Sequence, residues 1–334
     1  MEGTAPGEPV GATDALPSHF IGAPHNSTFV AQMSEASARR RYLLWRSLGT
    51  VLEQLPVQLA VRVAELMGAA IGQRSTSART AVHENLRSVL EFGADEPVDP
   101  RVLDRFTTRA FASYARYWAE GSTLPAQRPG LMHSRIDMVE GTEALTKAMH
   151  EGNGVVVALP HVGSWEWGGA LLARMGFPMT AVAEQLDPPE LFDWFVAKRR
   201  AIGLEIEPLD QRAGTVMLST LKAGGLVGLL CDRDLTGDGI GVEMFGRTVQ
   251  VPTGPATLAL RTGAALFGGV VYSGPGAQHT AHIIGPIPTE REGRLRGDIT
   301  RVTQLLADEV AGLIARRPEQ WHVFSDAFAR GGEG

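Results

Sequence analysis

The stretch Gly154-Val155-Val156-Val157-Ala158-Leu159-Pro160-His161 decides the fold of this chain. An apolar run that ends in proline and histidine predicts a buried strand with an imidazole at its carboxyl end. Open α/β sheets carry their chemistry at that edge. Ser164 is placed to cap the following helix, which puts Glu166 in the first helical turn. The spacing of His161 and Glu166 fits no single helical face, so it indicates a strand–loop–helix corner where both side chains face one cleft.

Strands and helices alternate from about residue 140 onward. The apolar pattern predicts strands at 154–159, 179–184, 204–208, 226–231, 265–273 and 279–285, and helices at 141–151, 165–175, 189–202, 214–224, 254–263 and 298–316. Strands separated by helical segments of about 10–15 residues indicate βαβ units. The last two strands are close enough together to be antiparallel. We therefore predict an α/β fold with a mixed, largely parallel central sheet flanked by helices.

An N-terminal helical segment is expected before this sheet. The predicted organisation is a disordered tail over residues 1–33, a helical region over 39–125 and an α/β core over 126–330. Pro56 divides a first amphipathic helix, beginning at Arg39-Arg40-Arg41, from a second helix. Three arginines beside an aromatic and aliphatic stripe suit an anionic membrane surface, or equally a helix packed on the core with a solvated basic end.

Composition excludes several classes of protein. A formal net charge of −6 argues against nucleic acid as the main partner. The single cysteine, Cys231, excludes a disulfide framework and lies in an apolar run typical of a core thiol. No apolar run is long enough to span a membrane, and the first 38 residues lack the Lys or Arg of a secretory signal. We expect a protein of the cytosol or of the cytosolic face of a membrane.

Polar residues recur at the predicted carboxyl ends of the strands. His161 follows the first strand, Glu184 ends the second, and Asp232-Arg233-Asp234 follows the fourth. Asp232 or Asp234 is able to orient the imidazole so that its other nitrogen accepts a proton. The same acidic run also fits a salt-bridged loop, and Glu166 fits simple charge compensation at a helix start.

Other kinds of catalytic chemistry fit the sequence less well. Ser164 lacks the setting of a nucleophile elbow, so direct attack by a substrate hydroxyl is favoured over a serine intermediate. His279 and His282 point to opposite faces of a strand, and we expect no metal site. Thr253 and Gly254 begin a helix whose free amides suit an anion or an oxyanion.

These motifs together resemble a known enzyme family. His161-x4-Glu166, Asp232-Arg233-Asp234 and Val251-Pro252-Thr253-Gly254-Pro255-Ala256 are similar to the lysophospholipid-acyltransferase-like superfamily and to its bacterial lipid A lauroyl/myristoyl acyltransferase branch. The match is closer still to the actinobacterial phosphatidylinositol mannoside acyltransferases, through Ser113-Tyr114-Ala115-Arg116-Tyr117-Trp118, Ala158-Leu159-Pro160-His161 and Val182-Ala183-Glu184. It runs in order from about residue 40 to residue 325, leaving the tail outside.

The resemblance implies transfer of a palmitoyl-type chain from acyl-CoA, without a cofactor, to a mannose hydroxyl of phosphatidylinositol mannosides. It implies a peripheral enzyme on the anionic inner leaflet of the cell membrane. By position, His161 is the general base and Asp232 and Glu166 are the other catalytic residues. The substrate-binding residues implied by the motifs are Glu184, Arg199, Arg233, Asp234, Thr253 and Gly254.

Two acidic residues depart from the pattern of the resembled family. Asp232 stands where that family has Glu, and Glu166 stands where the nearest relatives have Asp. Each swap keeps the charge and moves it by one methylene, so either carboxylate remains a candidate partner of His161. Two other functions also remain open: acylation of a lipid A or lysophospholipid acceptor, and a catalytically silent lipid-binding protein.

Overall fold

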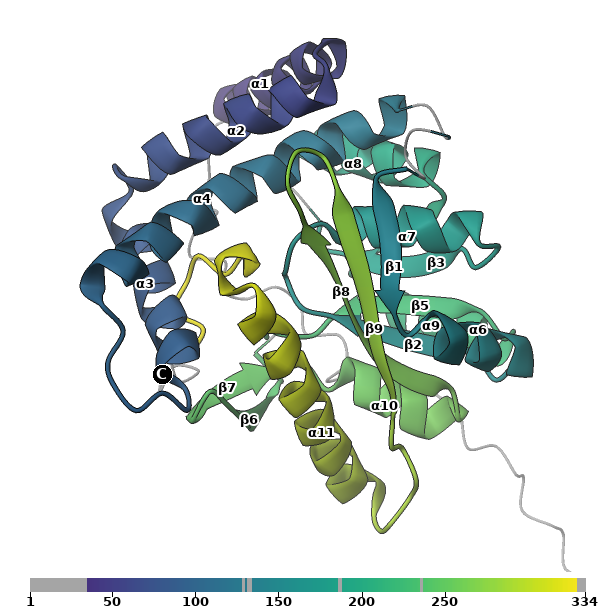
Figure 1. The fold of residues 1–334 in the computed structure, drawn as a ribbon. Coiled ribbons are helices and arrows are strands. Elements are labelled where there is room, and N and C mark those ends of the chain that lie inside the picture. The colour runs from purple at the N-terminus through teal and green to yellow at the C-terminus, as the bar shows by residue number, and fades with distance from the viewer. Residues whose placement is uncertain (1–34, 128–129, 131–133, 186–187, 235–236, 329–334) are drawn as a thin grey trace, which may run out of the picture.

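A seven-stranded sheet forms the centre of the protein (Figure 1). The computed structural model describes residues 35–127, 130, 134–185, 188–234 and 237–328, so the predicted tail over 1–33 lies outside the described residues. The strand order is β1-β9-β8-β2-β5-β3-β4. All neighbours are parallel except β8 and β9, which are antiparallel. This confirms the predicted mixed, largely parallel sheet and its antiparallel last pair.

The strands follow the predicted pattern with small shifts at their ends. Their bounds are β1 (Ile136–Glu140), β2 (Val155–Leu159), β3 (Met179–Ala183), β4 (Leu204–Pro208), β5 (Leu226–Leu230), β8 (Ala265–Ser273) and β9 (His279–Ile287). A separate hairpin consists of β6 (Ile240–Met244) and β7 (Arg247–Val251). The sequence analysis missed β1, β6 and β7.

Helices cover both faces of the sheet. α9 (Ala213–Lys222), α10 (Gly254–Thr262) and α11 (Leu295–Arg316) pack on one face, and α6 (Thr142–Glu151), α7 (Trp165–Arg174) and α8 (Pro189–Ala201) pack on the other. β2 is buried along its whole length, with Val156 and Ala158 in the first core and Val155, Val157 and Leu159 in the second. This two-residue alternation, with apolar side chains on both faces, explains why the sequence of β2 is continuously apolar.

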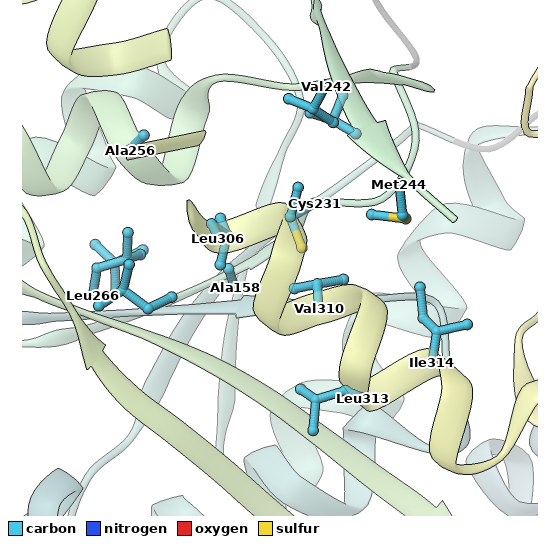
Figure 2. Close-up of a cluster of buried hydrophobic side chains, with 14 of the residues drawn as sticks. Ala158, Cys231, Val242, Met244, Ala256, Leu266, Leu306, Val310, Leu313 and Ile314 are labelled. Atoms are coloured by element: carbon cyan, nitrogen blue, oxygen red, sulfur yellow. The ribbon is translucent and has the colours of Figure 1, made fainter. Parts of the chain in front are cut away.

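Cys231 belongs to the first of these cores. Figure 2 shows its sulfur among Val242 and Met244 of the hairpin and Leu306 and Val310 of α11. Burial and the neighbouring Asp232 charge raise the pKa of this thiol well above its ordinary value. The expectation of a core thiol is confirmed.

The described residues before the sheet include four long helices: α1 (Glu35–Gln54), α2 (Val57–Gly72), α3 (Thr76–Glu91) and α4 (Pro100–Thr123). Figure 1 shows α4 crossing between the α1–α2 pair and the sheet. α2 approaches α4 closely at Gly68, where an added Cβ would lie 2.4 Å from the backbone oxygen of Phe111. α4 continues into the short helix η2 (Leu124–Ala126), and η3 (Pro318–Gln320) follows α11. Within the described residues, no helix combines the length and apolar character needed to span a membrane.

Candidate active site

Parallel register brings His161 and Asp232 together. Leu159 at the end of β2 pairs with Leu230 at the end of β5, and each polar residue stands two positions beyond its leucine. His161 Nδ1 lies 2.6 Å from Asp232 Oδ1, and the backbone N–H of His161 donates to Asp232 Oδ2 at 3.0 Å. The short side chain of Asp232 therefore reaches the imidazole directly.

The environment of Asp232 determines which ring nitrogen of the neutral His161 carries the proton. Burial raises the pKa of the Asp232 carboxyl, but the His161 charge and the hydrogen bonds from His161 and Trp321 outweigh it and hold the pKa below its ordinary value. An ionised carboxylate only accepts hydrogen bonds, so the proton of the neutral ring lies on Nδ1. Nε2 is then the ring nitrogen that keeps a lone pair for a ligand.

Glu166 lies in the first turn of α7, as predicted, but pairs with other groups. Its Oε1 accepts hydrogen bonds from the Tyr117 hydroxyl at 2.9 Å and from Arg199 at 3.1 Å. Its Oε2 has no hydrogen-bond partner among the residues that the structure describes. Of the two carboxylates proposed as partners of His161, the structure gives that contact to Asp232. Ser164 occupies the N-cap position without a capping hydrogen bond from its side chain.

Arg199 is anchored at the edge of the cleft by Glu166 and by aromatic rings. Its guanidinium carbon lies 4.8 Å from the centre of the Trp165 ring and 5.9 Å from that of Phe195. Burial lowers the pKa of Arg199, yet Glu166 and Tyr117 outweigh that effect and raise it. The guanidinium is therefore a permanent positive charge held in a fixed place.

A cavity of about 400 Å³ opens at the carboxyl edge of the sheet. Six of the predicted site residues line it: His161, Glu184, Arg199, Arg233, Thr253 and Gly254. Asp232 and Glu166 stand behind the wall, holding His161 and Arg199. Asp234 is not among the lining residues, and its carboxylate accepts hydrogen bonds from the backbone N–H groups of Gly237 and Gly239.

Aromatic side chains of α4 form another wall of this cavity. Tyr114, Tyr117 and Trp118 have the i, i+3, i+4 spacing that is typical of a helical core stripe. The structure shows that they line the cavity instead. Spacing alone does not reveal this, because a stripe that faces a cavity has the same period as one that faces a core.

The sequence analysis also missed Trp321 and His322. Trp321 Nε1 donates to Asp232 Oδ2 at 2.7 Å, and His322 lines the cavity with Nε2 2.9 Å from Ser113 Oγ. Burial, together with the His161 charge, lowers the pKa of His322 to about 3, so its ring is neutral near pH 7. One sequence signal could have identified them: Trp321 and His322 are adjacent, both side chains can donate a hydrogen bond, and both lie near the end of the predicted core.

Two groups on the cavity wall are able to stabilise a negative charge that develops on a substrate oxygen. The backbone N–H of Gly163, although it is close to His161 in sequence, already donates to the Gln320 carbonyl at 3.0 Å and is not a candidate. The start of α10 at Thr253 and Gly254, and the Arg233 side chain, both lie on the cavity wall. Thr253 is the N-cap residue, although its side chain makes no capping hydrogen bond. Among the described residues, no group of three His, Cys, Asp or Glu side chains is arranged to hold a metal ion.

Comparison with known proteins gives consistent matches. The sequence profile of the bacterial lipid A biosynthesis acyltransferase family matches residues 32–330. A phosphatidylinositol mannoside acyltransferase of Mycolicibacterium smegmatis is 36% identical over 251 residues, which cover 74% of this chain and 80% of the relative. A protein of the same name from Mycobacterium tuberculosis is 33% identical over 237 residues, covering 66% of this chain and 70% of the relative.

The Glu166–Arg199 contact yields a prediction about stability. Arg199→Met leaves the Glu166 carboxylate buried without its cation, so we expect the free energy of unfolding to fall by about 3 kcal/mol. The double variant Glu166→Gln/Arg199→Met carries no uncompensated charge and should recover at least half of that loss. Urea denaturation of the three proteins measures both values. Equal losses in the single and double variants would contradict the assignment.

Proposed function

The chain belongs to the bacterial lipid A biosynthesis acyltransferase family, and on that premise we propose that it transfers a palmitoyl-type chain from acyl-CoA to a mannose hydroxyl of phosphatidylinositol mannosides. One observation carries the proposal: a histidine oriented by a buried carboxylate stands on the wall of a cavity of about 400 Å³. The printed names of the two mycobacterial relatives support the acceptor class.

The proposed reaction needs a base but no covalent enzyme intermediate. Nε2 of His161 takes the proton of the acceptor hydroxyl while the hydroxyl oxygen bonds to the thioester carbonyl carbon. The carbonyl electron pair moves onto oxygen, and its return breaks the carbon–sulfur bond. The sulfur leaves with the pair of electrons of the carbon–sulfur bond and takes the proton from His161, which gives an ester and free CoA. Asp232 stabilises the imidazolium between these two proton transfers.

The developing oxyanion requires preorganised donors in a site that excludes water. The start of α10 at Thr253 and Gly254 places the positive end of a helix dipole on the cavity wall. The Arg233 guanidinium supplies a full charge on the same wall. We assign the oxyanion to one or both of these groups.

The remaining walls suit the two substrates. Val182, Phe192, Leu229 and Leu230 give the cavity an apolar side for an acyl chain. Glu184 and the anchored Arg199 add polar groups that suit the hydroxyls and the phosphate of an anionic glycolipid. The acceptor and the donor therefore meet beside His161.

A membrane surface is the proposed location, on its cytoplasmic side. Five apolar residues of α2 are exposed by 36% to 73% and recur along one face of the helix: Leu59, Val63, Leu66, Met67 and Ile71. Leu43 and Val51 of α1 are also exposed. A row of this kind fits the headgroup boundary of a bilayer, where a lipid acceptor resides. We therefore propose α2 as the main membrane contact, whereas the sequence pattern pointed to the first amphipathic helix.

Two other functions are compatible with the fold. Acylation of lipid A or of a lysophospholipid would use the same base and cavity, and only the acceptor would differ. A silent lipid-binding protein has no need of a histidine whose Nδ1–H donates to a buried carboxylate that also accepts a hydrogen bond from an indole. The paired His161 and Asp232 therefore favour an enzyme.

The catalytic proposal predicts a large loss of activity in His161→Gln. Because a positioned base contributes roughly 10²–10⁴-fold, transfer from palmitoyl-CoA to phosphatidylinositol mannosides should fall by at least about 100-fold. A radiolabelled acyl-transfer assay measures the rate, and circular dichroism checks that the variant is folded. Turnover within about threefold of the unaltered enzyme would refute the role of His161. The same assay with lipid A and lysophospholipid acceptors tests the acceptor class, and preference for either would overturn it.

The membrane proposal predicts weaker binding to vesicles in Leu66→Glu. Removing one large apolar side chain from the interface should lower the partition coefficient by at least about tenfold, because burying it is worth about 1.5–3 kcal/mol. Sedimentation with vesicles of phosphatidylglycerol and phosphatidylcholine measures the effect. Val139→Glu, at an apolar residue of β1 that is 61% exposed, is the matched control and should bind normally. Equal binding by both variants would contradict α2 as the contact.

A further inference from the structure

The segment after α11 lies along the corner that carries the catalytic histidine. The backbone N–H of His322 donates to the His161 carbonyl at 2.7 Å, and the N–H of Gly163 donates to the Gln320 carbonyl at 3.0 Å. Val162 and Trp321 form an antiparallel bridge between these two hydrogen bonds. The corner is therefore held by residues that lie about 160 positions away in the sequence.

Trp321 adds a side-chain contact to this backbone pairing. Its indole is 3% exposed, and Nε1 lies 2.7 Å from Asp232 Oδ2. The two oxygens of Asp232 thus have separate partners: Oδ1 faces His161 Nδ1, and Oδ2 accepts from the indole and from the His161 backbone N–H. With Oδ2 held from two sides, the carboxylate plane is fixed and Oδ1 points at the imidazole.

We infer that Trp321 is a positioning residue of the acyl-transfer site, which acts through Asp232 to set the orientation and basicity of His161. The inference rests on the proposed function of His161 as the general base. An indole N–H is suited to this task because it donates but never accepts. It therefore keeps the same direction in both protonation states of the imidazole, and it adds no charge to a buried site.

The pKa values of the titratable groups beside His161 and Asp232 are shifted away from the pH range of the test. Burial and Asp232 raise the pKa of the Cys231 thiol well above its ordinary value, and burial together with His161 lowers that of His322 to about 3. We therefore assign the acid limb of the activity profile to the His161–Asp232 pair as a unit.

Trp321→Phe tests the inference, because it removes the N–H and keeps most of the ring. We expect kcat to fall about 10-fold or more, as for other residues that orient a catalytic group through a second one, with KM for palmitoyl-CoA within about twofold. Without the indole, Asp232 holds a proton on the pair more strongly. The acid limb of kcat/KM should therefore move to higher pH, which a partly unfolded protein would not show.

Trp167→Phe is the matched control. Trp167 is fully buried, and its Nε1 has no hydrogen-bond partner among the described residues. This variant removes the same atoms from a core without removing a hydrogen bond, so the pH profile should stay in place. In an Asp232→Asn background, Trp321→Phe should cost less than threefold further, because the group through which it acts is already altered.

The outcomes separate this inference from the proposed function. If Trp321→Phe leaves the acid limb in place, the positioning role is wrong while His161 remains the base. The same holds if the fold-loss of activity in the double variant equals the product of the losses in Trp321→Phe and Asp232→Asn. If His161→Gln retains turnover, the proposed function fails first. A shifted limb in Trp321→Phe, together with a normal profile in Trp167→Phe, supports the inference.

Discussion

The parallel pairing of β2 with β5 is the constraint on which the site depends. With Leu159 opposite Leu230, the next residues of the two strands are carried in step to His161 and Asp232. A shift of one position would move the carboxylate away from the imidazole and would turn every side chain of the strand to the other face. Because β2 is buried on both faces, such a shift would also expose apolar surface. The energy that fixes the core therefore also fixes the catalytic pair.

The elements around the His161–Asp232 pair form the rest of the site. α4 brings Tyr114, Tyr117 and Trp118 to the cavity, and the segment after α11 brings Trp321 and His322. Together they enclose the imidazole and its carboxylate in a region of low polarity. There a hydrogen bond is worth more than it is in water, and an unpaired charge costs more. This explains why both buried carboxylates near the cavity, Asp232 and Glu166, have cationic or indole partners.

The local pattern of the sequence predicts much of this arrangement, and its failures have physical causes. Long apolar runs such as that of β2 identify buried strands, and the residues that follow them were correctly placed at the carboxyl edge. β1 was missed because it is a short edge strand with mostly polar or exposed positions. The β6–β7 hairpin has positive φ at both residues of its Phe245-Gly246 turn. Such turns usually carry Asn-Gly or Asp-Gly, so phenylalanine at the first position hides the turn from the sequence. Partners that lie far apart in the chain, such as Trp321 and Asp232, leave no local trace. For the same reason the nearness of Glu166 to His161 in sequence was misleading.

The state of His161 in the resting protein is the most direct test of the account. Histidine labelled with nitrogen-15, with a His161→Gln spectrum for assignment, reports which ring nitrogen carries the proton in the neutral imidazole. The account predicts a proton on Nδ1, shared with Asp232, and an unprotonated Nε2. A neutral His161 with its proton on Nε2 would contradict the pairing with Asp232 and, with it, the proposed base.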